Sequence, residues 1–475
     1  MTVALKSETP KLPALHVTLR AVADLKPNAR NARKHSASQI KKLTKAIEAF
    51  GFTASIVLGT DDEILVGHAR LDAARAAGLA EVPTISLAHL SPAEQRGFMI
   101  ADNRLAELAS WDADILKLEL TELKGFDFDF DLTDLGFETP DLNRILFTTD
   151  GTTDLDEADD SIPAIETVAV TALGDVWILG RHRLICGDAR MGQVYARLMP
   201  GGEVARVVVA DAPYNVPVAG HVTKRGADRR EFAMGVGEMS VAEFTDFLTT
   251  TLGHAGDRAV DGAIAYVFMD WRHMTEVLDA GRKAIGELKN LVVWAKRNAG
   301  MGAFYRSQHE LVFVFKKGTA PHVNTFGLGE HGRYRTNVWS YPGASGFHAD
   351  RDGDLAMHVT PKPVAMIAEA ILDVSHLDEI VLDPFGGSGS TLIAAEKTDR
   401  CARLIELDQL YCDVICRRFI ANGGTAVREA DGKTFEQAET DATSEVDNAV
   451  GTKPAGLGPD QPASDEHGPA DRSDD

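Results

Sequence analysis

Short apolar runs recur through the middle of the chain and alternate with stretches of helical periodicity. The runs are rich in β-branched residues, and they cover positions 207–209, 263–268, 291–294, 380–382 and 402–407. Continuous apolar runs of this length are typical of strands buried on both faces of a parallel sheet. The pattern predicts an α/β fold for residues 166–432.

Residues 1–125 show a different pattern and are expected to form a separate, smaller α+β domain. Positions 36–50 place apolar residues on one helical face. The apolar runs 56–58 and 64–66 are separated by a polar turn and predict a β-hairpin. The sequence Ser91-Pro-Ala-Glu94 is a capping box that predicts the start of another helix.

The net charge of −22 is unevenly distributed along the chain. Residues 127–160 contain 12 acidic side chains against one basic one, and residues 436–475 contain 11 against two. We therefore expect an acidic linker at 126–165 and a disordered tail at 433–475. The remainder is close to neutral, which permits a DNA partner.

Membrane and metal chemistry are not expected. No apolar run reaches the roughly 18 residues that a membrane-spanning helix needs, and the start of the chain lacks a secretory signal. A cytoplasmic location without membrane contact follows as an expectation. The four cysteines are too few for a disulfide framework, and their spacing favours buried thiols over a metal site.

The segment Asp211-Ala212-Pro213-Tyr214 directly follows the apolar run 207–209, so it is expected where a buried strand ends. A carboxylate, a main-chain carbonyl and an aromatic ring at such an edge can hold a planar ring that carries an amino group. Asp211 and the Ala212 carbonyl can accept hydrogen bonds from the amine, and Tyr214 offers a face for stacking.

A glycine-rich turn follows the run 380–382 and opens a small-residue helix. It reads Asp383-Pro-Phe-Gly-Gly-Ser-Gly-Ser-Thr391. Glycines allow the backbone to approach a nucleotide-type cofactor closely. Glu406 lies about 20 residues further on, the spacing at which an acid binds ribose hydroxyls.

In this order, the two segments resemble the β-class amino-methyltransferases of DNA, with Asp211 to Tyr214 matching their D-P-P-Y motif and Asp383 to Thr391 their cofactor loop. The resemblance extends over roughly residues 170–430. It implies a Rossmann-like sheet that binds S-adenosyl-L-methionine, and catalytic roles for Asp211, Ala212, Pro213 and Tyr214. The cofactor-binding residues that it implies are Asp188, Asp211, Lys362, Asp383, Phe385, Gly386, Gly387, Ser388, Gly389, Thr391, Glu406 and Asp408.

The expected reaction is methyl transfer to N6 of adenine in double-stranded DNA, because cytosine-specific members of the family usually have serine in place of Asp211. Cytosine N4 is the alternative target. A non-catalytic, ParB-like DNA-binding protein is the alternative of a different class. Ala212 departs from the family's proline but retains the carbonyl.

The N-terminal domain resembles the ParB N-terminal domain through the turn Gly67-His68-Ala69-Arg70. In some ParB-like proteins this turn binds nucleotide phosphates, so CTP is a candidate partner and a homodimer is a candidate assembly. Arg70 has the alternative of bonding a neighbouring acid or a helix carbonyl. A basic surface is also expected from Arg30, Arg33, Lys34, Lys41, Lys42 and Lys45.

DNA contacts are predicted from two basic segments of the methylase-like domain. Residues 218–237 are expected to form a mobile loop that contacts phosphates through Lys224, Arg225, Arg229 and Arg230. Residues 319–357 are expected to be a target-recognition insertion with Arg333 and Arg335. The alternative for that insertion is a structural loop that packs Trp339 against the sheet.

Overall fold

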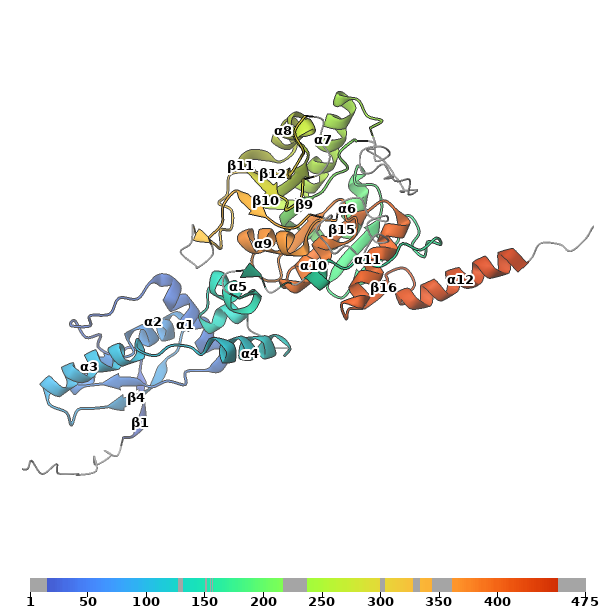
Figure 1. The fold of residues 1–475 in the computed structure, drawn as a ribbon. Helices are drawn as coiled ribbons and strands as arrows, with labels where there is room; N and C mark the ends of the chain where they lie inside the picture. The colour runs from blue at the N-terminus through green and yellow to red at the C-terminus, as the bar shows by residue number, and fades with distance from the viewer. Residues whose placement is uncertain are drawn as a thin grey trace, which may run out of the picture.

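The computed structural model describes residues 15–126, 131–149, 152–153, 155, 157–216, 237–299, 304–327, 334–343 and 361–451. Figure 1 shows an N-terminal unit, drawn in blue, on one side of a larger α/β unit. Helices α4 (Ala113–Lys124) and α5 (Thr139–Phe147) lie between the two units. Among the helices described, none is long and apolar enough to cross a bilayer.

A ten-stranded sheet forms the α/β unit, in the order β13-β11-β12-β10-β9-β14-β15-β8-β7-β16. Its central strands run parallel as neighbours: β10 (Ala259–Met269), β9 (Ala205–Ala210), β14 (Ile380–Asp383), β15 (Cys401–Glu406) and β8 (His182–Cys186). Antiparallel pairs extend both sides, formed with β11 (Gly286–Ala295), β12 (His309–Lys317), β7 (Val176–Leu179) and β16 (Ala426–Arg428). The short strand β13 (Val338–Ser340) pairs parallel with β11. The predicted α/β class is confirmed.

Helices cover both faces of this sheet. One face carries α6 (Gly192–Leu198), α7 (Val241–Asp257) and α8 (Met274–Ala284), and the other carries α9 (Val364–Val374), α10 (Ser390–Lys397) and α11 (Gln409–Ala421). Along β9, Val208 and Ala210 pack into the first layer, whereas Val207 and Val209 pack into the second. Burial on both faces explains why the sequence of this strand shows no polar alternation.

The N-terminal unit has a four-stranded sheet in the order β1-β4-β2-β3. Its elements are β1 (Val17–Ala21), α1 (Ala37–Phe50), β2 (Ile56–Leu58), β3 (Ile64–Val66), α2 (His68–Ala76), β4 (Glu81–Ser86) and α3 (Pro92–Ala106). The predicted hairpin of β2 and β3 is present. The capping box is also present, with Ser91 N donating to Glu94 Oε2 at 2.8 Å.

The acidic segment 126–165 is not a plain linker, which corrects the expectation from composition. It contains α5, whose Leu142 is fully buried together with Leu120 of α4 and Leu372 of α9. Asn143 donates to the Leu372 carbonyl at 3.2 Å and accepts from Arg400 at 3.1 Å. Apolar residues spaced for one helical face therefore outweigh the high local charge.

The expected disordered tail also begins with structure. Helix α12 (Phe435–Gly451) starts with Phe435, which is buried against Trp177 with ring centroids 5.3 Å apart. Glu439 pairs with Arg417 at 2.6 Å. The α/β unit thus extends past residue 432, and residues 452–475 lie outside the described residues.

Candidate active site

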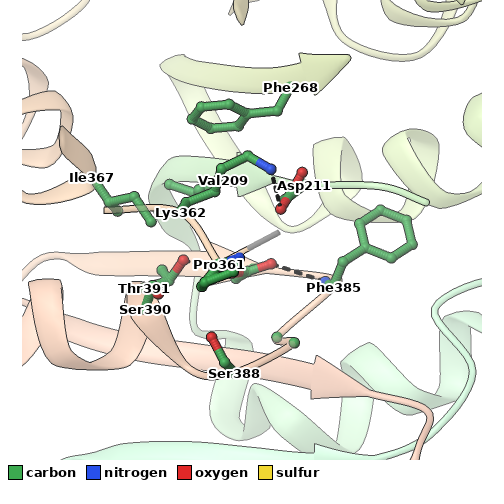
Figure 2. A pocket seen from close by; sticks show the side chains of 13 residues that line it. Val209, Asp211, Phe268, Pro361, Lys362, Ile367, Phe385, Ser388, Ser390 and Thr391 are labelled. Atoms are coloured by element: carbon green, nitrogen blue, oxygen red, sulfur yellow. Dashed lines mark hydrogen bonds and ion pairs between the residues drawn. The ribbon is translucent and has the colours of Figure 1, made fainter. Parts of the chain in front are cut away.

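The predicted catalytic and cofactor segments lie at the same edge of the sheet. Strands β9 and β14 are parallel neighbours, with Val208 paired to Leu382, so Asp211 and Asp383 follow at adjacent strand ends. One pocket is lined by residues from both segments (Figure 2): Val209, Asp211, Phe268, Pro361, Lys362, Ile367, Asp383, Phe385, Gly386, Gly387, Ser388, Ser390 and Thr391.

Lys362 contacts the predicted catalytic carboxylate directly. Its Nζ lies 2.7 Å from Asp211 Oδ2 and 3.5 Å from Glu310 Oε2, and Figure 2 shows the side chain reaching Asp211. Burial alone would lower the pKa of Lys362, but Asp211 and Glu310 outweigh it and raise the pKa. The buried group is therefore an ammonium ion that bridges two carboxylates.

Tyr214 is held by a residue that the sequence did not predict for the site. Its hydroxyl donates to Glu310 Oε2 at 2.9 Å, and Glu310 also forms an ion pair with Lys296. Burial would raise the pKa of Glu310, but Lys362 and Lys296 lower it to about 2. Burial and the nearby carboxylates raise the pKa of Tyr214 well above its ordinary value. A neutral phenol thus donates to a permanent anion.

Glu310 and Lys296 were missed by the sequence analysis. Lys296 directly follows β11, and Glu310 is the second residue of the largely apolar β12. A charged residue at the end of a buried apolar run was the available signal. The partner Tyr214 is 96 residues away in sequence, so spacing could not reveal the contact.

The glycine turn is shaped by Asp383. This carboxylate accepts from Phe385 N at 2.9 Å and from Thr391 Oγ1 at 2.6 Å. Gly387 and Gly389 have φ values of +52° and +83°, which favour glycine. Burial raises the pKa of Asp383 to about 7.

Four predicted cofactor residues are not among those that line the pocket: Asp188, Gly389, Glu406 and Asp408. Glu406 accepts from Gly387 N at 2.8 Å and from Asp408 N at 2.7 Å, and burial raises its pKa to about 7. Asp408 caps α11 by accepting from Leu410 N. Asp188 forms an ion pair with Arg190 at 2.6 Å.

The predicted DNA-binding role of Arg335 is wrong. Its side chain is only 13% exposed, because it pairs with Glu369 and, at 2.9 Å, with Asp373. It also lies 5.0 Å from the ring centroid of Trp339, which is buried on β13. This part of the insertion is therefore a structural segment that packs Trp339 against the sheet, which was the alternative expectation. The other predicted DNA contacts lie outside the described residues: Lys224, Arg225, Arg229, Arg230 and Arg333.

The side chains of the ParB-like turn form hydrogen bonds within the N-terminal unit. Arg70 Nη1 donates to the Ser55 carbonyl at 3.1 Å, and His68 Nε2 accepts from Asn28 N at 3.1 Å. On α1, Lys42 pairs with Glu138 and Lys45 with Asp134. Part of the expected basic surface is therefore neutralised by the acidic segment.

Comparison with known families agrees with this division of the chain. The model of the N6/N4 DNA methylase family matches residues 205–417. The model of the ParB-methyltransferase HTH domain matches residues 114–173, which include α4 and α5. This match includes the whole of the segment 126–165 that was expected to be a linker.

Individual relatives cover separate parts of the chain. The ParB-like nuclease domain-containing protein YnaK of Escherichia coli (strain K12) is 34% identical over 82 residues, which are 17% of this chain and 94% of that protein. The type II methyltransferase M2.MboI of Moraxella bovis is 25% identical over 140 residues, which are 28% of this chain and 50% of that protein. The chain therefore spans about half the length of this methyltransferase.

Solved structures resemble the chain only distantly. The crystal structure of the M1.HpyAVI–SAM complex aligns with a TM-score of 0.36 and 17% identity. The alignment covers 50% of this chain and 97% of that one.

Proposed function

We propose that this chain methylates an exocyclic amine of a base in duplex DNA. The proposal is supported by the match of residues 205–417 to the N6/N4 DNA methylase family, and by the matches to a ParB-like protein and to the ParB-methyltransferase HTH domain ahead of them. The observation that carries the proposal is the shared pocket. Asp211 lines this pocket together with Asp383 and residues of the glycine turn.

S-adenosylmethionine supplies the methyl group as part of a sulfonium ion. The pocket suits such a ligand because Gly386 and Gly387 line it without side chains and because Asp383 and Glu406 place carboxyl groups near a cationic ligand. Phe385, Gly386, Gly387 and Asp383 are the residues that would hold it.

The amine of the base is activated by two acceptors. Its lone pair is delocalised into the ring, which makes it a poor nucleophile. Hydrogen bonds to Asp211 and to the Ala212 carbonyl orient the lone pair towards the methyl carbon. Bound S-adenosylmethionine would supply the methyl group to this nitrogen and leave as S-adenosylhomocysteine, and the methylated amine would pass its extra proton to water. Tyr214 stacks on the base once it has left the duplex.

The favoured target is N6 of adenine, supported by the aspartate at position 211, and cytosine N4 is the second candidate. Purified protein is incubated with methyl-labelled S-adenosylmethionine and unmethylated plasmid, and the DNA is digested to nucleosides. Label in N6-methyladenine is expected. Label in N4-methylcytosine would reassign the base. An absence of label, together with DNA binding, would favour the non-catalytic alternative.

The N-terminal units are assigned DNA association, which positions the methylase unit on its substrate. Candidate partners for the ParB-like unit are CTP at Gly67–Arg70 and a second copy of the chain. Equilibrium dialysis with labelled CTP tests the first, and light scattering with and without the nucleotide tests the second. Arg70→Ala should remove CTP binding, and unchanged binding would place the nucleotide elsewhere.

A further inference from the structure

The loop between β11 and β12 lies at the same edge as the catalytic turn. Strand β12 is antiparallel to β10, and β10 is parallel to β9. The end of β11 and the start of β12 therefore lie at the edge where Asp211 follows β9. The base of the loop is joined to the site, because Lys296 pairs with Glu310 and Glu310 accepts from Tyr214.

Two adjacent aromatic side chains project from this loop into solvent. Phe304 is 87% exposed and Tyr305 is 82% exposed. Their ring centroids are 4.5 Å apart in an edge-to-face arrangement. A single exposed aromatic residue needs no explanation, but a packed pair of exposed rings at a functional edge indicates a surface made for contact.

The charge of the loop between β11 and β12 indicates which class of molecule it binds. From Lys296 to His309 the sequence has no acid; Lys296 is paired with Glu310, and the other two cationic side chains are Arg297 and Arg306, in a chain whose net charge is −22. Arg297 is exposed, and Arg306 donates to the Ala299 carbonyl at 2.8 Å. A nucleic acid suits such a loop because it offers phosphates to the cationic side chains and bases on which the exposed rings can stack.

A second loop at this edge also carries an aromatic and a cationic side chain, and there Arg272 is paired with Asp270 at 3.1 Å. It follows β10 and contains η5 (Trp271–His273). Trp271 is half exposed, and the Arg272 guanidinium lies 4.9 Å from the centroid of its ring. Aromatic and cationic side chains thus flank the catalytic turn from two strands.

We propose that Phe304 and Tyr305 insert into duplex DNA and fill the space left by the flipped base, with Arg297 and Arg306 on the adjacent phosphates. The inference rests on the proposed function, since only a base-flipping enzyme leaves such a gap. Stacking of an aromatic ring on the neighbouring bases replaces the stacking lost with the target base.

The test compares duplex DNA with the same DNA after denaturation, so the recognition sequence need not be known. In single strands no gap must be filled. The variant F304A/Y305A should methylate duplex DNA at least roughly tenfold more slowly, in line with the loss of aromatic stacking. Its rate on denatured DNA and its affinity for S-adenosylmethionine should change less than about twofold, in keeping with a contact made only to duplex.

Tyr334→Ala provides the matched control. Tyr334 is 84% exposed but precedes β13, at the end of the strand away from this edge. Its removal should leave both rates unchanged. Equilibrium binding to the duplex with S-adenosylhomocysteine gives a second measurement, in which F304A/Y305A should bind roughly tenfold more weakly and Tyr334→Ala normally.

Full duplex activity and binding in F304A/Y305A would overturn the inference, as would an equal loss of activity on both forms of DNA. In either case an active wild-type protein would leave the proposed function intact. A wild-type protein that methylates neither form would remove the proposed function itself.

Discussion

The Tyr214 hydroxyl donates a hydrogen bond of 2.9 Å to Glu310 Oε2. This contact joins the catalytic turn after β9 to the start of β12. In the sheet order, β10 lies between these two strands. Because Glu310 stays anionic and Tyr214 stays neutral, the bond is charge-assisted, and such bonds are stronger and more directional than neutral ones. The ring that is proposed to stack on the base is thus fixed at its outer end.

Glu310→Met removes the acceptor and should lower kcat roughly tenfold, because loss of a hydrogen bond to a charged group costs about 1.5–3 kcal/mol. Glu310→Gln retains an acceptor and should lose less. In a double-mutant cycle, Tyr214→Phe should cost little when Met is already at position 310. Strictly additive effects in the cycle would show that Glu310 does not act through Tyr214. Glu369→Met serves as a control for the loss of a buried ion pair away from the pocket.

Lys362→Met should abolish activity and destabilise the fold by about 3–5 kcal/mol, because it leaves two buried carboxylates without their shared cation. Urea unfolding measures the second effect. Lys289→Met is the control: Lys289 pairs with Glu287 at 3.2 Å, and the two side chains are 36% and 56% exposed, so its loss should cost less than about 1 kcal/mol. A stable Lys362→Met protein would show that the ammonium is not needed to hold the carboxylates.

Cofactor affinity should rise with pH between about 6 and 8. Asp383 and Glu406 each have a pKa of about 7, raised by burial. Below that pH they are protonated and give no attraction to a cationic ligand, whereas above it they are anionic. Binding of the cation should therefore release protons, and affinity at pH 6 should be lower than at pH 8 by roughly tenfold or more.

Calorimetry in buffers of different ionisation enthalpy measures this proton release. Asp383 also faces Asp211 and Lys362, which shift its pKa in opposite directions. Asp383→Asn should therefore reduce both the affinity and its dependence on pH. An affinity that does not change across this range would contradict the assignment.

Asn143→Ala should destabilise the contact between α5 and the α/β unit. It removes the acceptor of the buried Arg400 Nη2 and the donor to the Leu372 carbonyl. Leaving such groups with fewer partners costs about 1–3 kcal/mol, which a lower thermal midpoint would reveal. The neighbouring Arg144 is exposed, so Arg144→Ala should leave the midpoint nearly unchanged, and equal midpoints for the two variants would contradict the prediction.

Local patterns in the sequence predicted the strands well because burial on both faces leaves a strong apolar signal. They also placed Asp211 and Asp383 at strand ends, and the parallel pairing of β9 and β14 brings these ends together. Composition was a weaker guide. The many acids at 126–165 led to the prediction of a linker, and α5 was missed. A few apolar residues on one face of α5 suffice to pack it against α4 and α9.

Long-range pairing explains the remaining differences. Arg335 was predicted to face DNA, but Glu369 and Asp373 of α9 neutralise it. Glu310 could not be connected to Tyr214 from the sequence, because strand order and register bring them together. These contacts depend on the assembled sheet and leave no local pattern.

Helix α9 begins beside the pocket and ends at the contact with α4 and α5. Lys362 lies two residues before its start, and Leu372 near its end packs with α4 and α5. Its 11 residues form a rod ~16 Å long. A tilt of α4 and α5 against Leu372 would therefore move the helix that begins beside the buried ammonium, giving the upstream units a mechanical route to the chemistry.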